Sequence, residues 1–336
     1  MELLQRWNNN TTSHLKDFYT SSSTPSHYLY YYRQQQNYEN DYRIRSVVGH
    51  KDSIYCVQFD RRKIVTGSRD KTIKFWHHDN PSHCYRTLCG HEASVLCLQY
   101  NDTILVSGSS DHTVIVWSMK SFEILYRLSG HLSGVLDVCF EDASDNDNPL
   151  IASCSKDTTI KIWKDQRLVR SLCGHRGPVN AIQFKGTRLV SASGDTTIKL
   201  WDMTTGKCLR DFEGHTHGLA CIQFDGKKIV SGGNDNKIKV WDADTGDCIF
   251  TCTGHTGLVR SLFFDQDKIV SGSYDQSIRI WSIKTGECIR IFNRCHTSWV
   301  FDVMFDETQI ISTSQDQKIV IIDFAHDLDT THIVKV

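Results

Sequence analysis

The chain has 336 residues and a formal net charge of −1, from 38 lysines and arginines against 39 aspartates and glutamates. A protein that clamps nucleic acid usually carries a strong basic excess, so this balance argues against a nucleic-acid partner. No run of 18 apolar residues is present and the N-terminus lacks the apolar core of a signal peptide, which together predict a cytoplasmic or nuclear protein with no membrane partner.

The first 42 residues differ in composition from the rest. They contain polar runs of low complexity, at 8–13, 21–24 and 34–36, of a kind that buries too little apolar surface to fold alone. We therefore predict that residues 1–42 form a linker that is mostly disordered. Tyr28–Arg33 is its one aromatic-rich stretch, expected to pack on the rim of the following domain or to form part of a short helix.

From residue 50 onward a pattern recurs seven times with a period of about 40 residues. Each repeat contains a histidine, a hydroxyl residue, an aspartate six residues before the closing position, and a closing tryptophan, which the seventh repeat replaces by Ile322. The first repeat has His50, Thr66, Asp70 and Trp76, and the fifth has His215, Ser231, Asp235 and Trp241. This period and signature are typical of a four-stranded propeller blade. The sequence thus predicts an all-β fold, a seven-bladed WD40 β-propeller covering residues 43–336.

The ends of the repeat region predict how the ring closes. Residues 42–48 read as an outer strand without a blade of its own, and the last repeat stops after its third strand, Lys318–Ile322. The N-terminal strand should therefore complete the seventh blade and remove an exposed edge.

The histidine, hydroxyl and aspartate also resemble the parts of a catalytic triad. An enzyme needs one such set, whereas here the set recurs in every blade at constant register. A buried polar network that links the strands of each blade explains the recurrence. We interpret the four-residue sets, called tetrads below, as structural and predict that the chain is not an enzyme.

Thirteen cysteines raise the question of disulfides or metal. Cys56, Cys97 and Cys221 each lie six residues after a repeat histidine, and Cys208, Cys248 and Cys288 each lie seven after a tryptophan. Placement by strand register predicts small core residues in a reducing compartment. No Cys-x-x-Cys pair occurs, so we predict no metal site and no cofactor.

The third repeat is longer than the others because of an acidic insert, Glu141–Asn148, between its first and second strands. A solvated loop on the face opposite the aspartate-bearing loops is the expected structure. A second docking site is the alternative.

The loops before each first strand, together with those between second and third strands, should form one face of the ring, called the top face below. Basic and hydroxyl residues fall there, with apolar and aromatic residues among them, and this mixture predicts a site for a phosphorylated peptide. The residues concerned are Tyr55, Arg69, Ser94, Ser110, Leu136, Lys156, Asn180, His217, Leu258, Arg260 and Tyr274.

Several segments are similar to one known family. Ser107–Asp111, Cys154–Asp157, Ser191–Asp195 and His215–Cys221 resemble, in order, blades two to five of the F-box/WD-repeat substrate receptors of the beta-transducin repeat-containing (Slimb) type. The resemblance implies recognition of a doubly phosphorylated degron by the top-face residues, and it adds Gly218 and Ala220 to them. His217 and Trp299 stand where that family has arginines.

This resemblance implies the substrate-recognition propeller of an SCF-type ubiquitin ligase, with phosphorylated protein substrates as partners. The Skp1 adaptor and cullin would be partners only if an F-box lies upstream, because residues 1–42 do not supply one. The alternative is a general WD-repeat scaffold in a multiprotein complex, without a link to a ligase.

Overall fold

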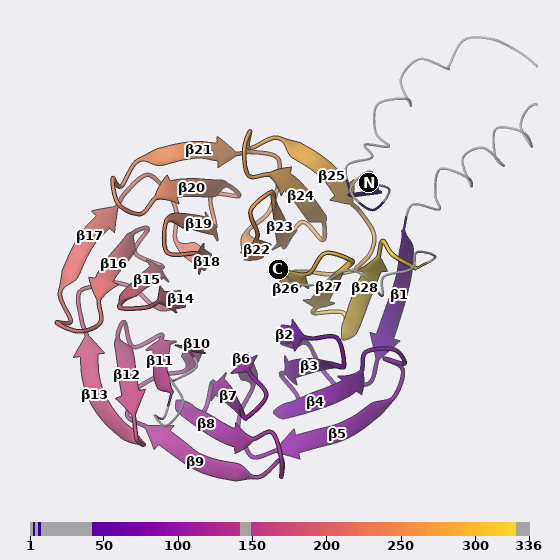
Figure 1. The fold of residues 1–336 in the computed structure, drawn as a ribbon, viewed down its shortest axis with the longest axis horizontal. Helices are drawn as coiled ribbons and strands as arrows, with labels where there is room; N and C mark the ends of the chain where they lie inside the picture. The colour runs from indigo at the N-terminus through magenta and orange to yellow at the C-terminus, as the bar shows by residue number, and fades with distance from the viewer. Residues whose placement is uncertain (1–2, 4–5, 8–41, 142–148, 327–336) are drawn as a thin grey trace, which may run out of the picture.

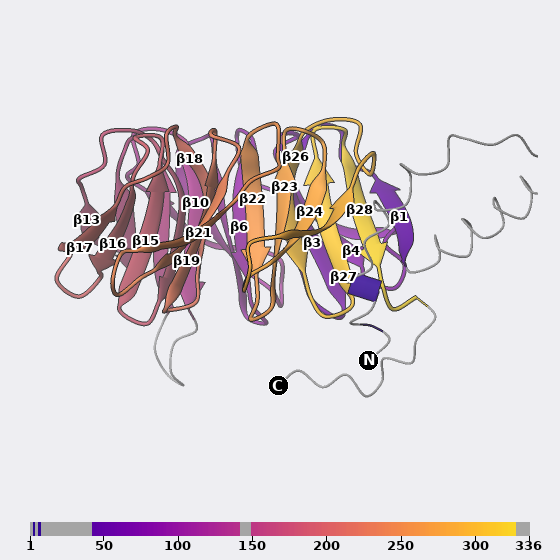
Figure 2. The same cartoon turned by 90° about the horizontal axis from the view of Figure 1, so that it is seen from above.

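The computed structural model describes residues 3, 6–7, 42–141 and 149–326. These residues form strands β1–β28, arranged as seven four-stranded sheets. Figure 1 shows the sheets set around a central axis, and Figure 2 shows the same ring edge-on. The predicted seven-bladed all-β propeller is confirmed.

Each of the first six blades takes four consecutive strands, ordered from the central channel outward. Blades 1 and 2 consist of β2 (Ile54–Phe59), β3 (Lys63–Ser68), β4 (Thr72–His77), β5 (Cys84–Cys89), β6 (Val95–Tyr100), β7 (Ile104–Ser109), β8 (Thr113–Ser118) and β9 (Ile124–Ser129). Blades 3 and 4 consist of β10 (Val135–Glu141), β11 (Leu150–Ser155), β12 (Ile160–Lys164), β13 (Arg167–Leu172), β14 (Val179–Lys185), β15 (Arg188–Ser193), β16 (Ile198–Asp202) and β17 (Cys208–Phe212).

Blades 5 and 6 consist of β18 (Leu219–Phe224), β19 (Lys228–Gly233), β20 (Ile238–Asp242), β21 (Cys248–Cys252), β22 (Val259–Phe264), β23 (Lys268–Ser273), β24 (Ile278–Ser282) and β25 (Cys288–Phe292). Blade 7 is built from β26 (Val300–Phe305), β27 (Gln309–Ser314), β28 (Lys318–Asp323) and β1 (Arg43–Val48).

Strand β1 closes the ring, as the sequence predicts. It pairs antiparallel with β28 over six residues, from Arg43 opposite Asp323 to Val48 opposite Lys318. Val47 is only 5% exposed and packs with Ile64 and Trp76 of blade 1. Because β1 pairs with blade 7 and packs on blade 1, it joins the first and last blades.

The alternation of apolar residues explains the packing between blades. In β20, Ile238 and Val240 are almost fully buried and join a core shared with blade 6, while Lys239 between them is partly exposed. The residue after each tetrad aspartate adopts a left-handed turn, with φ between 61° and 75° in the seven blades. The turn places the aspartate at the start of the third strand, where its carboxylate can accept from backbone N–H groups.

The cysteine prediction is right for one set and wrong for the other. All thirteen cysteines are free, and Cys56, Cys97 and Cys221 are buried. Cys208 and Cys248, however, are exposed, and Cys288 is only half-buried. The reason is that the outer strands form the rim of the ring, so most residues of β17 and β21 face solvent.

Two further predictions concern segments at the edges of the described structure. Tyr28–Arg33 lies outside the described residues, as does the acidic insert apart from Glu141, whose carboxylate accepts a hydrogen bond from Gly186 N at 3.1–3.2 Å. Within 1–42, Trp7 is 2% exposed and packs on blade 7, a contact that the predicted linker does not include. The described residues contain no apolar helix long enough to span a membrane and no metal-binding group of three or more His, Cys, Asp or Glu side chains.

Candidate functional site at the channel mouth

The tetrads form one continuous hydrogen-bonded chain in each of the first six blades. In blade 5, Trp241 Nε1 donates to Ser231 Oγ at 2.9 Å, His215 Nε2 lies 2.9 Å from the same oxygen, and His215 Nδ1 lies 2.7 Å from Asp235 Oδ2. The histidines and hydroxyl residues are buried throughout. The tetrads therefore tie the loop before each blade to its second and third strands, which is a structural role.

The protonation of the tetrads follows from their surroundings. Desolvation lowers the pKa of His50, His131, His175 and His255. Partial burial opposes ionisation of the aspartates, but hydrogen bonds from the histidine, from a hydroxyl and from backbone N–H groups outweigh it and hold the pKa of Asp157 and Asp195 at about 2. Each of these blades thus combines a neutral histidine with an ionised aspartate.

Blade 7 lacks the indole donor because Ile322 occupies the closing position. His296 still lies 2.9 Å from Ser312 Oγ, but its Nδ1 is 3.1 Å from Asp316 Oδ2, longer than the 2.7–2.9 Å of the other blades. The longer distance indicates a weaker network in blade 7, where the indole donor is missing.

In each blade, the loop before the first strand and the loop between the second and third strands are joined by one backbone hydrogen bond on the top face. The backbone N–H of the residue before each tetrad aspartate donates to the carbonyl of the residue three after the histidine, at 2.8–3.1 Å in all seven blades. Arg69, Ser110, Lys156 and Tyr274 of the predicted site are such donors, and Ser94, Gly218 and Leu258 are such acceptors. The structure therefore places these predicted residues on one face.

The residues five after each histidine lie further in, at the wall of the central channel. Tyr55, Leu136, Asn180, Ala220 and Arg260 of the predicted site all line this channel, whose cavity volume is about 930 Å³. Asn180 Nδ2 donates to Leu219 O at 2.5 Å, and Arg260 Nη1 lies 3.5 Å from Ala220 O. The predicted residues thus divide between the wall of the channel and the loops around its mouth.

An aromatic cluster stands at the mouth between blades 6, 7 and 1. The rings of Tyr274 and Trp299 stack with centroids 4.4 Å apart and planes 3° apart. Phe301 lies beneath them, 5.9 Å from Tyr274 and 4.9 Å from Tyr55. Trp299 is 43% exposed although it is the largest side chain of the group. An exposed aromatic stack at a concave mouth is a typical anchor for a protein partner.

The charges of the top face are less basic than the sequence suggested. Arg69 lies 3.8 Å from the Asp52 carboxylate, and His217 is exposed and bonds to Thr216 Oγ1 at 3.1 Å. All seven tetrad aspartates have a lowered pKa and lie just beneath this face. Their negative charges offset the exposed lysines and arginines, which weakens the case for a phosphate site.

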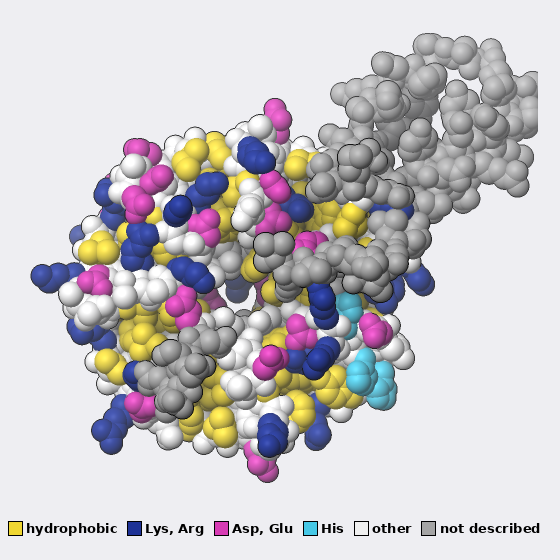
Figure 3. Space-filling view, viewed as in Figure 1, with side chains coloured by type: hydrophobic (Ala, Val, Ile, Leu, Met, Phe, Trp, Pro, Cys, Tyr) yellow, Lys and Arg dark blue, Asp and Glu magenta, His cyan; other side chains and the backbone are white. Residues whose placement is uncertain are grey.

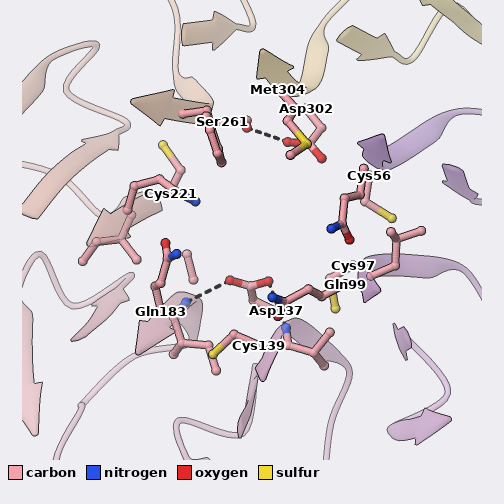
Figure 4. Close-up of a pocket in the computed structure, with 18 of the residues that line it drawn as sticks. Cys56, Cys97, Gln99, Asp137, Cys139, Gln183, Cys221, Ser261, Asp302 and Met304 are labelled. Atoms are coloured by element: carbon pink, nitrogen blue, oxygen red, sulfur yellow. Dashed lines mark hydrogen bonds between the residues drawn. The ribbon is translucent and has the colours of Figure 1, made fainter. Parts of the chain in front are cut away.

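Below the mouth, two carboxylates that sequence reasoning missed join neighbouring blades. Asp302 of blade 7 accepts from Val57 N of blade 1 at 2.8 Å and from Ser261 Oγ of blade 6 at 2.6 Å. Asp137 of blade 3 accepts from Ile182 N of blade 4 at 2.9 Å. Figure 4 shows the two aspartates on opposite sides of the channel.

Glutamines make the same kind of link at other junctions between blades. The Gln58 amide both accepts from Tyr100 N at 2.6 Å and donates to Tyr100 O at 3.0 Å, and Gln99 binds the backbone of Phe140 in the same way. The sequence carried a signal for the carboxylates, because Asp137 and Asp302 occupy the same register, six after the histidine, as Cys56, Cys97 and Cys221.

We expect Asp137 to make folding stability depend on pH. Burial raises its pKa from 3.8 to about 7, with Asp302 adding to the rise and Arg260 opposing it. The folded state therefore holds the proton more tightly than the unfolded state, so ionisation costs stability. This cost is absent below about pH 4, grows as pH rises from 4 to 7, and is complete above pH 7.

Asp137→Asn removes this titration, so the variant should gain stability relative to the unchanged protein when the pH is raised from 5 to 8. Urea unfolding at the two pH values measures the difference, with the exposed Asp247→Asn in the same protein as the matched control. An equal difference in stability at both pH values would contradict the raised pKa.

Comparison with known proteins agrees with the blade structure. The family model described as "WD domain, G-beta repeat" matches seven segments, at residues 42–77, 82–118, 122–164, 166–202, 206–242, 246–282 and 286–323. Among curated proteins, the chain is 32% identical over 172 residues to the nuclear distribution protein nudF of Aspergillus flavus, a match covering 49% of this chain and 28% of the relative.

Two further relatives have similar names. Nuclear distribution protein nudF 1 of Talaromyces marneffei is 40% identical over 96 residues, covering 27% of this chain and 20% of the relative. Nuclear distribution protein PAC1 of Fusarium vanettenii is 37% identical over 101 residues, covering 26% and 22%. The chain thus spans less than a third of the length of the curated relatives it matches.

These findings correct the predicted family resemblance. The relatives are nuclear distribution proteins rather than F-box substrate receptors, so the prediction of an SCF-type ligase receptor is wrong. The predicted partners, phosphorylated degron substrates with Skp1 and cullin, are wrong for the same reason. The face-pointing residues that carried the resemblance include positions that the same backbone hydrogen bond places on the top face in all seven blades. A match there is therefore weak support for one particular ligand.

Proposed function

Since the chain belongs to the WD domain, G-beta repeat family, we propose that it is a non-catalytic scaffold that holds a partner protein on its top face. The observation that carries the proposal is the exposed stack of Tyr274 and Trp299 at the channel mouth. An apolar side chain of this size gains about 1.5–3 kcal/mol from full burial, and a partner that covers the stack supplies that burial.

The surroundings of the stack favour a protein ligand over a small molecule. Tyr55, Leu136 and Phe301 provide apolar surface next to Asn180 and Arg260, whose polar groups can orient a backbone or a side chain. These five residues lie in the innermost strands of their blades, and the loops that carry Tyr274 and Trp299 are held in place by the tetrads and by the backbone hydrogen bonds of the top face. Because the face is rigid, a partner binds it without a large ordering cost.

The names of the relatives add a cellular context to the proposal. They support a part in nuclear distribution for this chain. A non-catalytic role agrees with the tetrads, since seven equivalent sets with buried histidines offer no single open site for a substrate.

We expect the double variant Trp299→Ala, Arg69→Ala to lose a specific set of bound proteins. The measurement is affinity capture of the full chain from cells, with quantitative mass spectrometry of what is bound. The matched control is Leu209→Ala, Ile249→Ala, two exposed residues of the outer strands. Equal recovery of every partner by both double variants would overturn the assignment of the top face.

A further inference from the structure

A second candidate site lies on the face of the ring opposite the top face, between blades 6 and 7. There the N-terminal residues Leu3, Arg6 and Trp7, which have helical conformation, pack against the propeller. In Figure 1 this segment lies near β25 and β28, in Figure 2 it lies at the lower edge of the ring, and Figure 3 looks onto the same face with the channel as a hollow at its centre. Trp7 is among the largest fully buried side chains of the described structure.

The pocket surrounds the indole of Trp7 on several sides. Phe324 stacks on it with ring centroids 4.1 Å apart and planes 24° apart, and Phe305 lies 5.9 Å away at a tilt. Lys268 Nζ stands 4.8 Å from the ring centroid, within the range of a cation–π contact. The indole N–H donates to Glu307 O at 3.0 Å. Aromatic stacking, a cation and a hydrogen-bond acceptor together select tryptophan over other apolar residues.

The residues next to Trp7 are recognised as well. Arg6 Nη1 donates to Phe324 O at 3.3 Å, and Arg290 Nη1 donates to the backbone carbonyl of Arg6. Leu3 packs on the edge of the same core. In a helical segment residues i, i+3 and i+4 share one face, and this spacing joins Leu3 to Arg6 and Trp7. The pocket thus contacts Leu3 and Arg6 as well as the indole ring of Trp7.

The site is connected to ring closure. Phe324 follows β28 directly, and Tyr42, just before β1, lies 6.0 Å from Phe324 and 5.2 Å from Phe292. The Arg290 guanidinium lies 4.6 Å from the Tyr42 ring and also binds the Arg6 carbonyl. Filling the pocket therefore stabilises the pairing of the closing strand β1 with β28.

We propose that this pocket is a peptide-binding site, filled by the chain's own Leu3, Arg6 and Trp7, for helical segments with leucine, arginine and tryptophan at i, i+3 and i+4. The contacts given above are made by residues 3, 6 and 7 themselves. A free peptide of the same sequence therefore binds the pocket when the chain's own tryptophan does not fill it.

The test uses the full chain with Trp7→Ala and a fluorescent synthetic peptide of residues 1–12. We expect fluorescence anisotropy to show saturable binding to the Trp7→Ala chain, at least tenfold tighter than to the unchanged chain, in which Trp7 competes. The same peptide with Trp7→Ala should bind neither chain. Urea unfolding supplies a second measurement, because the peptide should raise the midpoint of the Trp7→Ala chain and leave that of the unchanged chain as it is.

Trp7→Leu, which keeps apolar volume but lacks the indole N–H, replaces Trp7→Ala if the latter is insoluble. The proposal is overturned if the peptide fails to bind the folded variant. It is also overturned if the peptide binds the variant and the unchanged chain equally, since that places the binding elsewhere.

Discussion

Replacement of Arg43–Val48 by six glycine and serine residues is expected to abolish cooperative folding of the whole ring. The replacement keeps the chain length but removes side chains and β-propensity from β1, which pairs with β28 over six residues. When the weakened strand separates from β28, its backbone hydrogen bonds with that strand are lost, at about 1 kcal/mol each. Together with the lost burial of Val47, this amounts to roughly 5 kcal/mol. Because a whole domain is stable by only about 5–15 kcal/mol, this loss is decisive. Circular dichroism with urea unfolding measures it.

Two neighbouring valines provide the matched control for this experiment. Val47 is 5% exposed and Val48 is 62% exposed. Val47→Ser should lower the free energy of unfolding by about 1–3 kcal/mol, and Val48→Ser should change it by less than about 0.5 kcal/mol. An unchanged unfolding midpoint in the replaced chain would show that β1 does not close the ring.

The sequence predicts the parts of the fold that repeat. Seven copies of one pattern identify His215, Asp235 and Trp241 as members of a shared network, because chance would not preserve their spacing. Closure by β1 is predicted by elimination, since the last repeat lacks an outer strand and the first is preceded by a spare one. Both predictions rest on local spacing, which a single sequence displays directly.

Contacts that occur only once were harder to predict. Trp7 lies 317 positions from Phe324, and no periodicity joins the two residues. Asp137 and Asp302 follow a register that the sequence displays, but their role depends on which backbone N–H groups the neighbouring blades present. The ligand was mispredicted for a related reason. Top-face positions are determined by the fold, whereas a ligand is selected by the balance of nearby charges, including the seven ionised tetrad aspartates.

A large single-residue effect is expected for Asp235→Ala. Its carboxylate accepts from His215 Nδ1 at 2.7 Å, from Lys237 N at 3.2 Å and from Thr216 N at 3.3 Å. Removing it leaves a buried histidine donor and two loop N–H groups without their acceptor, which should cost on the order of 3–4 kcal/mol. Urea unfolding measures this loss, and Asp247→Ala, an exposed aspartate of the same blade, should change stability by less than about 0.5 kcal/mol.

The same change in blade 7 tests whether the indole strengthens the network. Asp316→Ala removes the equivalent carboxylate from a tetrad that has Ile322 in place of tryptophan and a longer His–Asp distance of 3.1 Å. In blade 5 the Trp241 N–H donates to Ser231 Oγ, the same oxygen that lies 2.9 Å from His215 Nε2, so the indole adds a hydrogen bond to the network. Without that donor the network is less ordered, so Asp316→Ala should destabilise the ring by less than Asp235→Ala. Equal losses in the two blades would mean that the closing tryptophan acts only by packing.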